Sequence, residues 1–176
     1  MKNLTKILTM AGIVACSAFA TKASAQQIAT DNGDAHATVV TPISIAKAAD
    51  MEFGNLAVDA SGGTVVLPAT GSRTTTGGVT LPSTTGTVNA ASFTVSGQAN
   101  YVYAITLPSS ITITDGASHN MTINSVVSSP TVASGGTLSA GGTETLYVGG
   151  TLNVTGSQTP GTYNTTTPFD VSVVYN

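Results

Sequence analysis

The chain has 176 residues, only 7% of them charged, and a formal net charge of −3 at pH 7. Of its five cationic residues only Lys47 and Arg73 follow residue 25, against eight acids, so the chain beyond residue 25 carries 2 − 8 = −6. An acidic chain with so few cations argues against nucleic acid and anionic membrane as partners. Its many threonine, serine, glycine and valine residues are typical of an extracellular all-β protein.

Residues 1–25 have the pattern of a secretory signal peptide. Lys2 and Lys6 precede an apolar run at residues 7–20, and Ala23-Ser24-Ala25 supplies a small-x-small cleavage pattern. The run is too short and too interrupted to predict a membrane span. We therefore expect a secreted protein that passes through the periplasm and ends at the cell surface or outside the cell.

The only cysteine, Cys16, lies inside this N-terminal segment. Cleavage after Ala25 leaves a chain with no disulfide and no cysteine metal site. Residues 13–16 also loosely fit a bacterial lipoprotein box, so lipidation of Cys16 is an open alternative to that cleavage. Cleavage leaves 176 − 25 = 151 residues, enough for one domain with its own core.

Residues 26–34 are predicted to be a flexible N-terminal extension, because they are short and polar. Asp31-Asn32-Gly33-Asp34 within them is either half of a calcium loop or simply a flexible turn. Residues 35–176 are predicted to form a single β-sandwich domain. This part opens with an alternation of small and apolar residues at Ala35, Ala37 and Val39.

Short apolar runs separated by glycine-rich turns follow along the rest of the chain. The predicted strands are residues 51–54, 64–67, 79–81, 92–96, 101–107, 111–114, 121–127, 143–148 and 152–155. Pairs of glycines, such as Gly149-Gly150, separate many of them and supply the positive φ of tight turns. Strand patterns at this spacing with no helical period predict an all-β fold, an immunoglobulin-like antiparallel β-sandwich.

The last strand is predicted from Phe169 onward. Its inward-facing positions are Phe169, Val171, Val173 and Tyr175, with polar residues mostly between them. Such a strand is central, covered by another segment, or left with an open edge that invites pairing.

Side chains suited to catalysis are few, and no enzyme, cofactor or metal site is predicted. Asp115, Ser118 and His119 are the residue types of a hydrolytic triad, but they crowd into one turn, where a triad cannot be laid out. Several tyrosines suggest either sugar stacking or ordinary core packing with the hydroxyl at the rim; they are Tyr101, Tyr103, Tyr147 and Tyr163.

Five stretches together resemble a known family. They are residues 40–45 (VTPISI), 51–54 (MEFG), 105–108 (ITLP), 146–152 (LYVGGTL) and the closing 161–163 (GTY) with 169–176. This pattern resembles DUF4402, a secreted bacterial domain of unknown function. That domain is in turn similar to the spore-coat-U-like pilins of chaperone–usher systems.

The pilin resemblance implies a sandwich that lacks a strand, with an open groove beside the C-terminal strand. Phe169, Val171, Val173 and Tyr175 would line the groove of the acceptor subunit. The N-terminal segment of another subunit would fill it by β-strand addition, and the implied donor residues are Ile28, Ala35, Ala37 and Val39. The implied partners are like subunits in a homopolymer, a periplasmic chaperone and an outer-membrane usher.

The sequence thus predicts a non-enzymatic, secreted structural subunit that assembles head-to-tail by donor-strand complementation. The alternative is a self-contained β-sandwich that acts as a surface adhesin or a carbohydrate-binding module.

Overall fold

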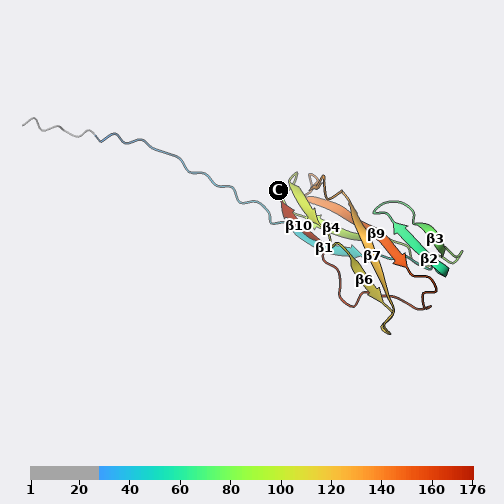
Figure 1. Ribbon diagram of the computed structural model, residues 1–176. Helices are drawn as coiled ribbons and strands as arrows, with labels where there is room; N and C mark the ends of the chain where they lie inside the picture. The colour runs from blue at the N-terminus through green and yellow to red at the C-terminus, as the bar shows by residue number, and fades with distance from the viewer. Residues whose placement is uncertain (1–27) are drawn as a thin grey trace, which may run out of the picture. The chain divides into compact units, whose positions relative to one another are not determined.

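The computed structural model describes residues 28–176, and within them it contains ten β-strands and no helix (Figure 1). In chain order these are β1 (Ser44–Ala49), β2 (Ala57–Leu67), β3 (Thr74–Thr80), β4 (Ala91–Ser96), β5 (Val102–Thr106), β6 (Ile111–Thr114), β7 (Asn120–Ser129), β8 (Gly136–Thr137), β9 (Thr143–Val154) and β10 (Ser172–Tyr175). No membrane-spanning helix is found in the part of the chain that the structure describes. The signal-peptide and Cys16 predictions fall on residues outside that part.

The strands form two antiparallel sheets. In the larger sheet the order is β1-β4-β9-β2-β3, with β7 paired to β9 and β6 paired to β7. The smaller sheet has the order β10-β5-β8. The prediction of an all-β, immunoglobulin-like antiparallel sandwich is confirmed.

Strand β9 is the longest and joins both ends of the larger sheet. Its residues 143–148 pair with β4, residues 150–154 pair with β2, and β7 pairs along its other edge. The prediction of two strands with a turn at Gly149-Gly150 was therefore wrong. A Cβ on Gly149 would collide with the backbone of residues 67–69, so glycine here permits close approach rather than a turn.

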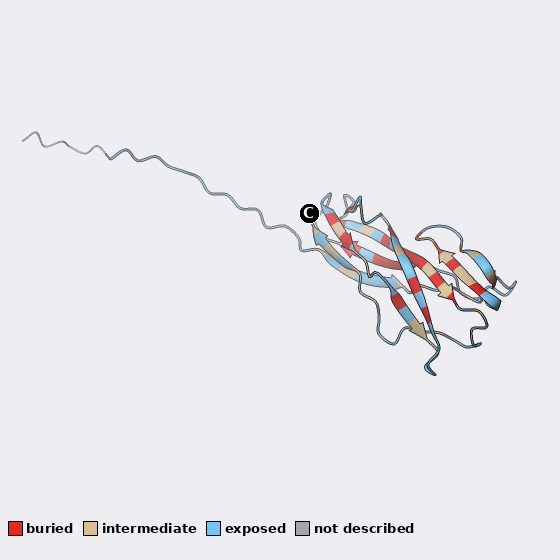
Figure 2. Ribbon diagram, in the orientation of Figure 1, coloured by how far each residue is buried: buried red, intermediate tan, exposed pale blue. Residues whose placement is uncertain are grey.

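Two apolar clusters fill the interior. The first draws on β2, β3, β6, β7 and the C-terminal half of β9, with members such as Val65, Ile123 and Leu152. The second draws on β4, β5 and the N-terminal half of β9. Met51 and Phe169 contact both clusters. Figure 2 shows the resulting alternation of buried and exposed bands along β7 and β9.

Two predicted strands differ at their ends. Residues 51–54 form only one isolated bridge, between Glu52 and Asn89. The C-terminal strand begins at Ser172 instead of Phe169, because only residues 172–175 find partners on β5. Residues 28–37, taken by themselves, are exposed and contain no strand.

Candidate functional site

The C-terminal strand has one partner only. Among the described residues β10 pairs with β5, and β1 pairs with β4 in the opposite sheet. The two strands also lie close together, with Cα atoms within 8 Å and no ladder between them. Each strand therefore borders the same opening with an edge whose backbone N–H and C=O groups have no strand partner.

The predicted acceptor residues all face this opening from one side. Phe169, Val171, Val173 and Tyr175 pack against the second cluster and are only half-buried. Val174, between the last two, points away and is 60% exposed. The alternation read from the sequence thus gives the correct facing for these side chains, including the two that precede the strand.

Residues from the start of the domain form the other side. Ile43, Ile45 and Met51 are half-buried against the second cluster from β1 and its flanks. The sequence analysis did not assign them to the site, although the alternation of Ile43 and Ile45 was visible. What the sequence did not reveal was that β1 and β10 are neighbours.

Tyr175 closes the narrow end of the opening. Its hydroxyl donates a hydrogen bond to the carbonyl oxygen of Thr41 (2.8 Å) and accepts one from the backbone N–H of Gln98 (2.6 Å). The Thr41 N–H donates in turn to the side-chain oxygen of Gln98 (3.2 Å). The ring stands edge-on to Tyr101, with centroids 5.5 Å apart. These contacts fix the chain at the point where it enters β1.

The opening widens in the other direction into a cavity of about 850 Å³. Residues 50–58, which follow β1, form one wall, and residues 158–165, which lead towards β10, form the other. The floor is apolar and belongs to the first cluster; it includes Phe53, Ile111, Met121, Ile123 and Leu152. We call the β1–β10 opening together with this cavity the strand cleft.

A buried arginine supports one wall of the strand cleft. The Arg73 guanidinium donates hydrogen bonds to the carbonyl oxygen of Phe53 and, at 3.3 Å, to that of Thr85. Both acceptors are backbone groups, so the arginine holds the loop conformation rather than an acidic partner. Arg73 is 8% exposed, and its role was not foreseen from the sequence.

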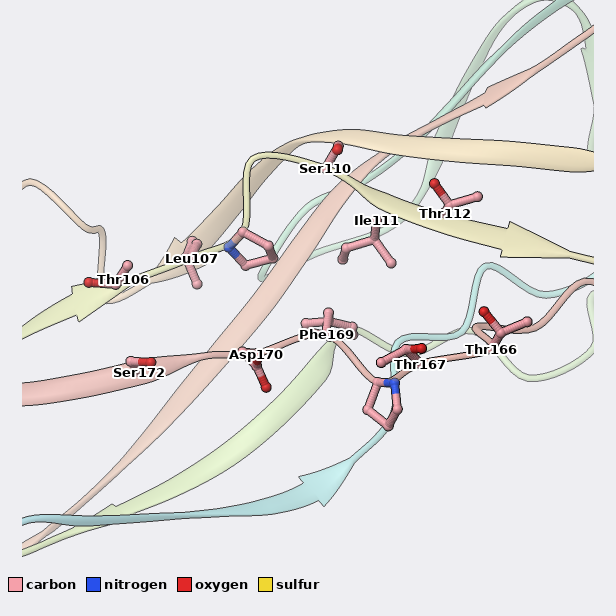
Figure 3. A pocket seen from close by; sticks show the side chains of 12 residues that line it. Thr106, Leu107, Ser110, Ile111, Thr112, Thr166, Thr167, Phe169, Asp170 and Ser172 are labelled. Atoms are coloured by element: carbon pink, nitrogen blue, oxygen red, sulfur yellow. The ribbon is translucent and has the colours of Figure 1, made fainter.

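A second, smaller cavity of about 470 Å³ lies on the other side of the segment that leads into β10. Residues 106–112 and residues 166–172 line it, and Ile111 and Phe169 point towards each other across it (Figure 3). Phe169 also lines the larger cavity and meets Phe93 edge-on at 6.4 Å. The segment before β10 is thus flanked by open space on both sides.

The predicted donor residues lie in exposed chain. Ile28 is 83% exposed and Val39 is 97% exposed, and Ala35 and Ala37 are exposed as well. Within Asp31-Asn32-Gly33-Asp34 the carboxylate of Asp31 accepts a hydrogen bond from the Asn32 N–H at 2.8 Å, as in a local turn. Across residues 28–176, no three His, Cys, Asp or Glu side chains are grouped as a metal site would need.

The ionisable side chains that interact have structural partners. Asp115 pairs with His119 at 2.6 Å; the Ala117 N–H, and after it the His119 side chain, lower the pKa of Asp115. Tyr103 donates to the Glu144 carboxylate at 2.8 Å, and burial, followed by this bond, raises the pKa of Tyr103. Ser118 lies in the same turn as the first pair, so the arrangement is a hydrogen-bonded turn.

Residues 43–175 match the family described as "Domain of unknown function (DUF4402)". The chain belongs to the DUF4402 family. The matched range begins at Ile43 and ends at Tyr175, so both walls of the strand cleft lie within the DUF4402 domain. Neither the curated proteins nor the solved structures contained a match to the chain.

Proposed function

We propose that this DUF4402 protein is a secreted, pilin-like structural subunit that assembles head-to-tail by donor-strand complementation. The observation that carries the proposal is the strand cleft: an unpaired strand edge beside a continuous apolar floor. An extended segment placed there gains backbone hydrogen bonds from β10 and buries alternate side chains on the two clusters. The partners are further copies of this chain, together with a periplasmic chaperone and an outer-membrane usher that handle the subunit before assembly.

The donor is the N-terminal segment of the next copy, with Ile28, Ala35, Ala37 and Val39 as its cleft-facing residues. Fifteen residues, 26–40, reach at most about 50 Å when extended, which is enough to run the length of a neighbouring cleft. Because the donor and the acceptor are different surfaces, the contact does not close on itself, and it propagates into a fibre at the cell surface.

Insertion requires β1 to move. A strand paired on both sides needs about 10 Å between its neighbours, whereas β1 and β10 approach more closely than that. The donor therefore starts at the wide end, above the apolar floor, and separates β1 from β10 as it advances towards Tyr175. This order places the first contacts where the cavity already exists.

The test is gel migration of material sheared from the cell surface, in SDS, with and without boiling. A ladder in cold SDS that collapses to one band on boiling is expected, because dissociation means pulling a paired strand from a core. Ala37→Asp places a charge in the cleft and should abolish the ladder. His36→Asp is the matched control at the neighbouring, outward-facing position and should retain it.

Both substitutions lie in residues 28–37, outside the strands of the sandwich, so neither is expected to affect folding. A single monomer band in both lanes for the wild-type chain would refute the assembly. A ladder that survives Ala37→Asp would refute this segment as the donor. On the acceptor side, Val173→Asp should remove the ladder, and Val174→Asp, on the opposite face of the same strand, should not.

A further inference from the structure

The outer face of the larger sheet carries a row of uncharged polar side chains. Strand pairing aligns five residues across β6, β7, β9, β2 and β3, in the order Thr112, Thr122, Asn153, Thr64 and Thr76. The neighbouring row, one residue along each strand, is made of buried core residues such as Ile123 and Leu152. Because side chains alternate across a sheet, the polar row faces outward.

These groups are held in place by hydrogen bonds. The hydroxyls of Thr64 and Thr76 lie 2.7 Å apart, and the Asn153 amide nitrogen donates to the Thr122 carbonyl oxygen at 3.0 Å. The row is therefore a set of oriented donors and acceptors at the regular spacing of neighbouring strands, about 4.8 Å.

Further along β9 the same face presents a tyrosine. Tyr147 is 41% exposed and pairs with Ser92 on one side and Ser129 on the other. Two residues away along β9 are Thr145 and Gly149, so the four nearest positions on this face hold only small or short side chains. An aromatic ring in such surroundings is a raised apolar platform within a polar face.

We propose that this outer face, from Tyr147 to the row through Asn153, binds a neutral polysaccharide. The side chains named above are all uncharged; the acids Asp59 and Asp115 lie at the ends of β2 and β6. A charged partner would lose hydration here without meeting an opposite charge. A neutral sugar chain exchanges hydroxyl hydrogen bonds with threonine and asparagine, and one of its C–H faces stacks on the Tyr147 ring.

A second copy of the chain fits this face less well. Protein interfaces are anchored by several buried aromatic and arginine side chains, and this face offers one tyrosine among hydroxyls. The face is also separate from the strand cleft, since it lies on the solvent side of the larger sheet. Sugar binding is thus independent of assembly.

The experiment is affinity electrophoresis of the secreted protein in native gels that contain hydroxyethylcellulose, laminarin, amylose or galactomannan, with polygalacturonate as the charged comparison. Retardation by at least one neutral polysaccharide is expected. Tyr147→Ala should weaken it about tenfold. Thr145→Glu, which adds a charge at an exposed position two residues away, should weaken it as well.

Tyr101→Ala is the matched control, because Tyr101 is 43% exposed and precedes β5 of the other sheet. Its retardation should equal that of the wild-type chain, and circular dichroism confirms that each variant is folded. The proposal is overturned by no retardation on any of the four neutral gels, by retardation only on polygalacturonate, or by equal retardation of Tyr147→Ala. A wild-type dimer in sedimentation that Tyr147→Ala dissolves would instead make this face a self-contact and would also overturn it.

Discussion

Replacing Tyr175 by phenylalanine removes one oxygen atom that joins three segments. The hydroxyl bonds Thr41, before β1, and Gln98, between β4 and β5, and the ring itself contacts Tyr101. The substitution keeps the ring and its contact, so the loss is confined to two hydrogen bonds. These bonds span 134 and 77 residues of sequence, so they hold distant parts of the chain together.

The magnitude follows from the surroundings of the two partners. A net contribution of about 1 kcal/mol per hydrogen bond gives about 2 kcal/mol for the pair. Water can replace the hydroxyl at the exposed Thr41, which moves the expected loss to about 1.5 kcal/mol. For a domain of this size, that lowers the melting temperature by roughly 3–6 °C.

Urea unfolding followed by circular dichroism measures this difference. The midpoint should fall while the slope of unfolding free energy against urea stays unchanged, because the folded chain buries the same surface. Tyr147→Phe, which removes a hydroxyl from an exposed ring, serves as the control and should change the free energy by less than about 0.5 kcal/mol. A loss for Tyr175→Phe no larger than the control would refute the reasoning that this hydroxyl closes the strand cleft.

Arg73→Met should lower the free energy of unfolding by about 1–3 kcal/mol, because it leaves the Phe53 carbonyl without its buried donor; urea unfolding measures it. Gly149→Ala should yield little folded protein at 37 °C, since a Cβ there overlaps backbone, and the soluble fraction on expression reports it. The pKa of Tyr103 is raised in the folded chain above its ordinary 10, so the stability from its neutral form is full below pH 10 and is lost above it. Tyr103→Phe should therefore show a smaller fall in melting temperature between pH 9 and 11 than the wild-type chain does.

Alternation along single strands was the part of the fold that the sequence predicted best. Residues 111–114 form β6 with the predicted bounds, and the facing of Val173 and Tyr175 was correct. Local period-2 patterns report which side chains face a core, and that information is contained in a few consecutive residues.

Glycine pairs were the main source of error. Gly149-Gly150 lies inside β9, and Gly77-Gly78 lies inside β3, where a turn had been predicted. A glycine serves a tight turn or a close backbone approach equally well, and only the tertiary structure decides which.

The site itself was predicted in half. The β10 side was found because its residues are consecutive, whereas the wall formed by residues 50–58 and its support by Arg73 depend on contacts between segments far apart in sequence. No local pattern shows that β1 lies beside β10, about 130 residues later.

Strand β9 has a consequence for how the domain comes apart. Because its two halves contribute to different apolar clusters, neither cluster can lose order without removing a wall of the other. Amide protons in β9 and in its partners β4 and β7 should exchange with solvent only when the whole domain unfolds. The segment of residues 158–171 is joined to a strand only by the bridge between Asn164 and Thr114, so its amides should exchange by local opening. The domain thus combines a cooperative sheet with one separately opening flap, and that flap is the wall of the strand cleft.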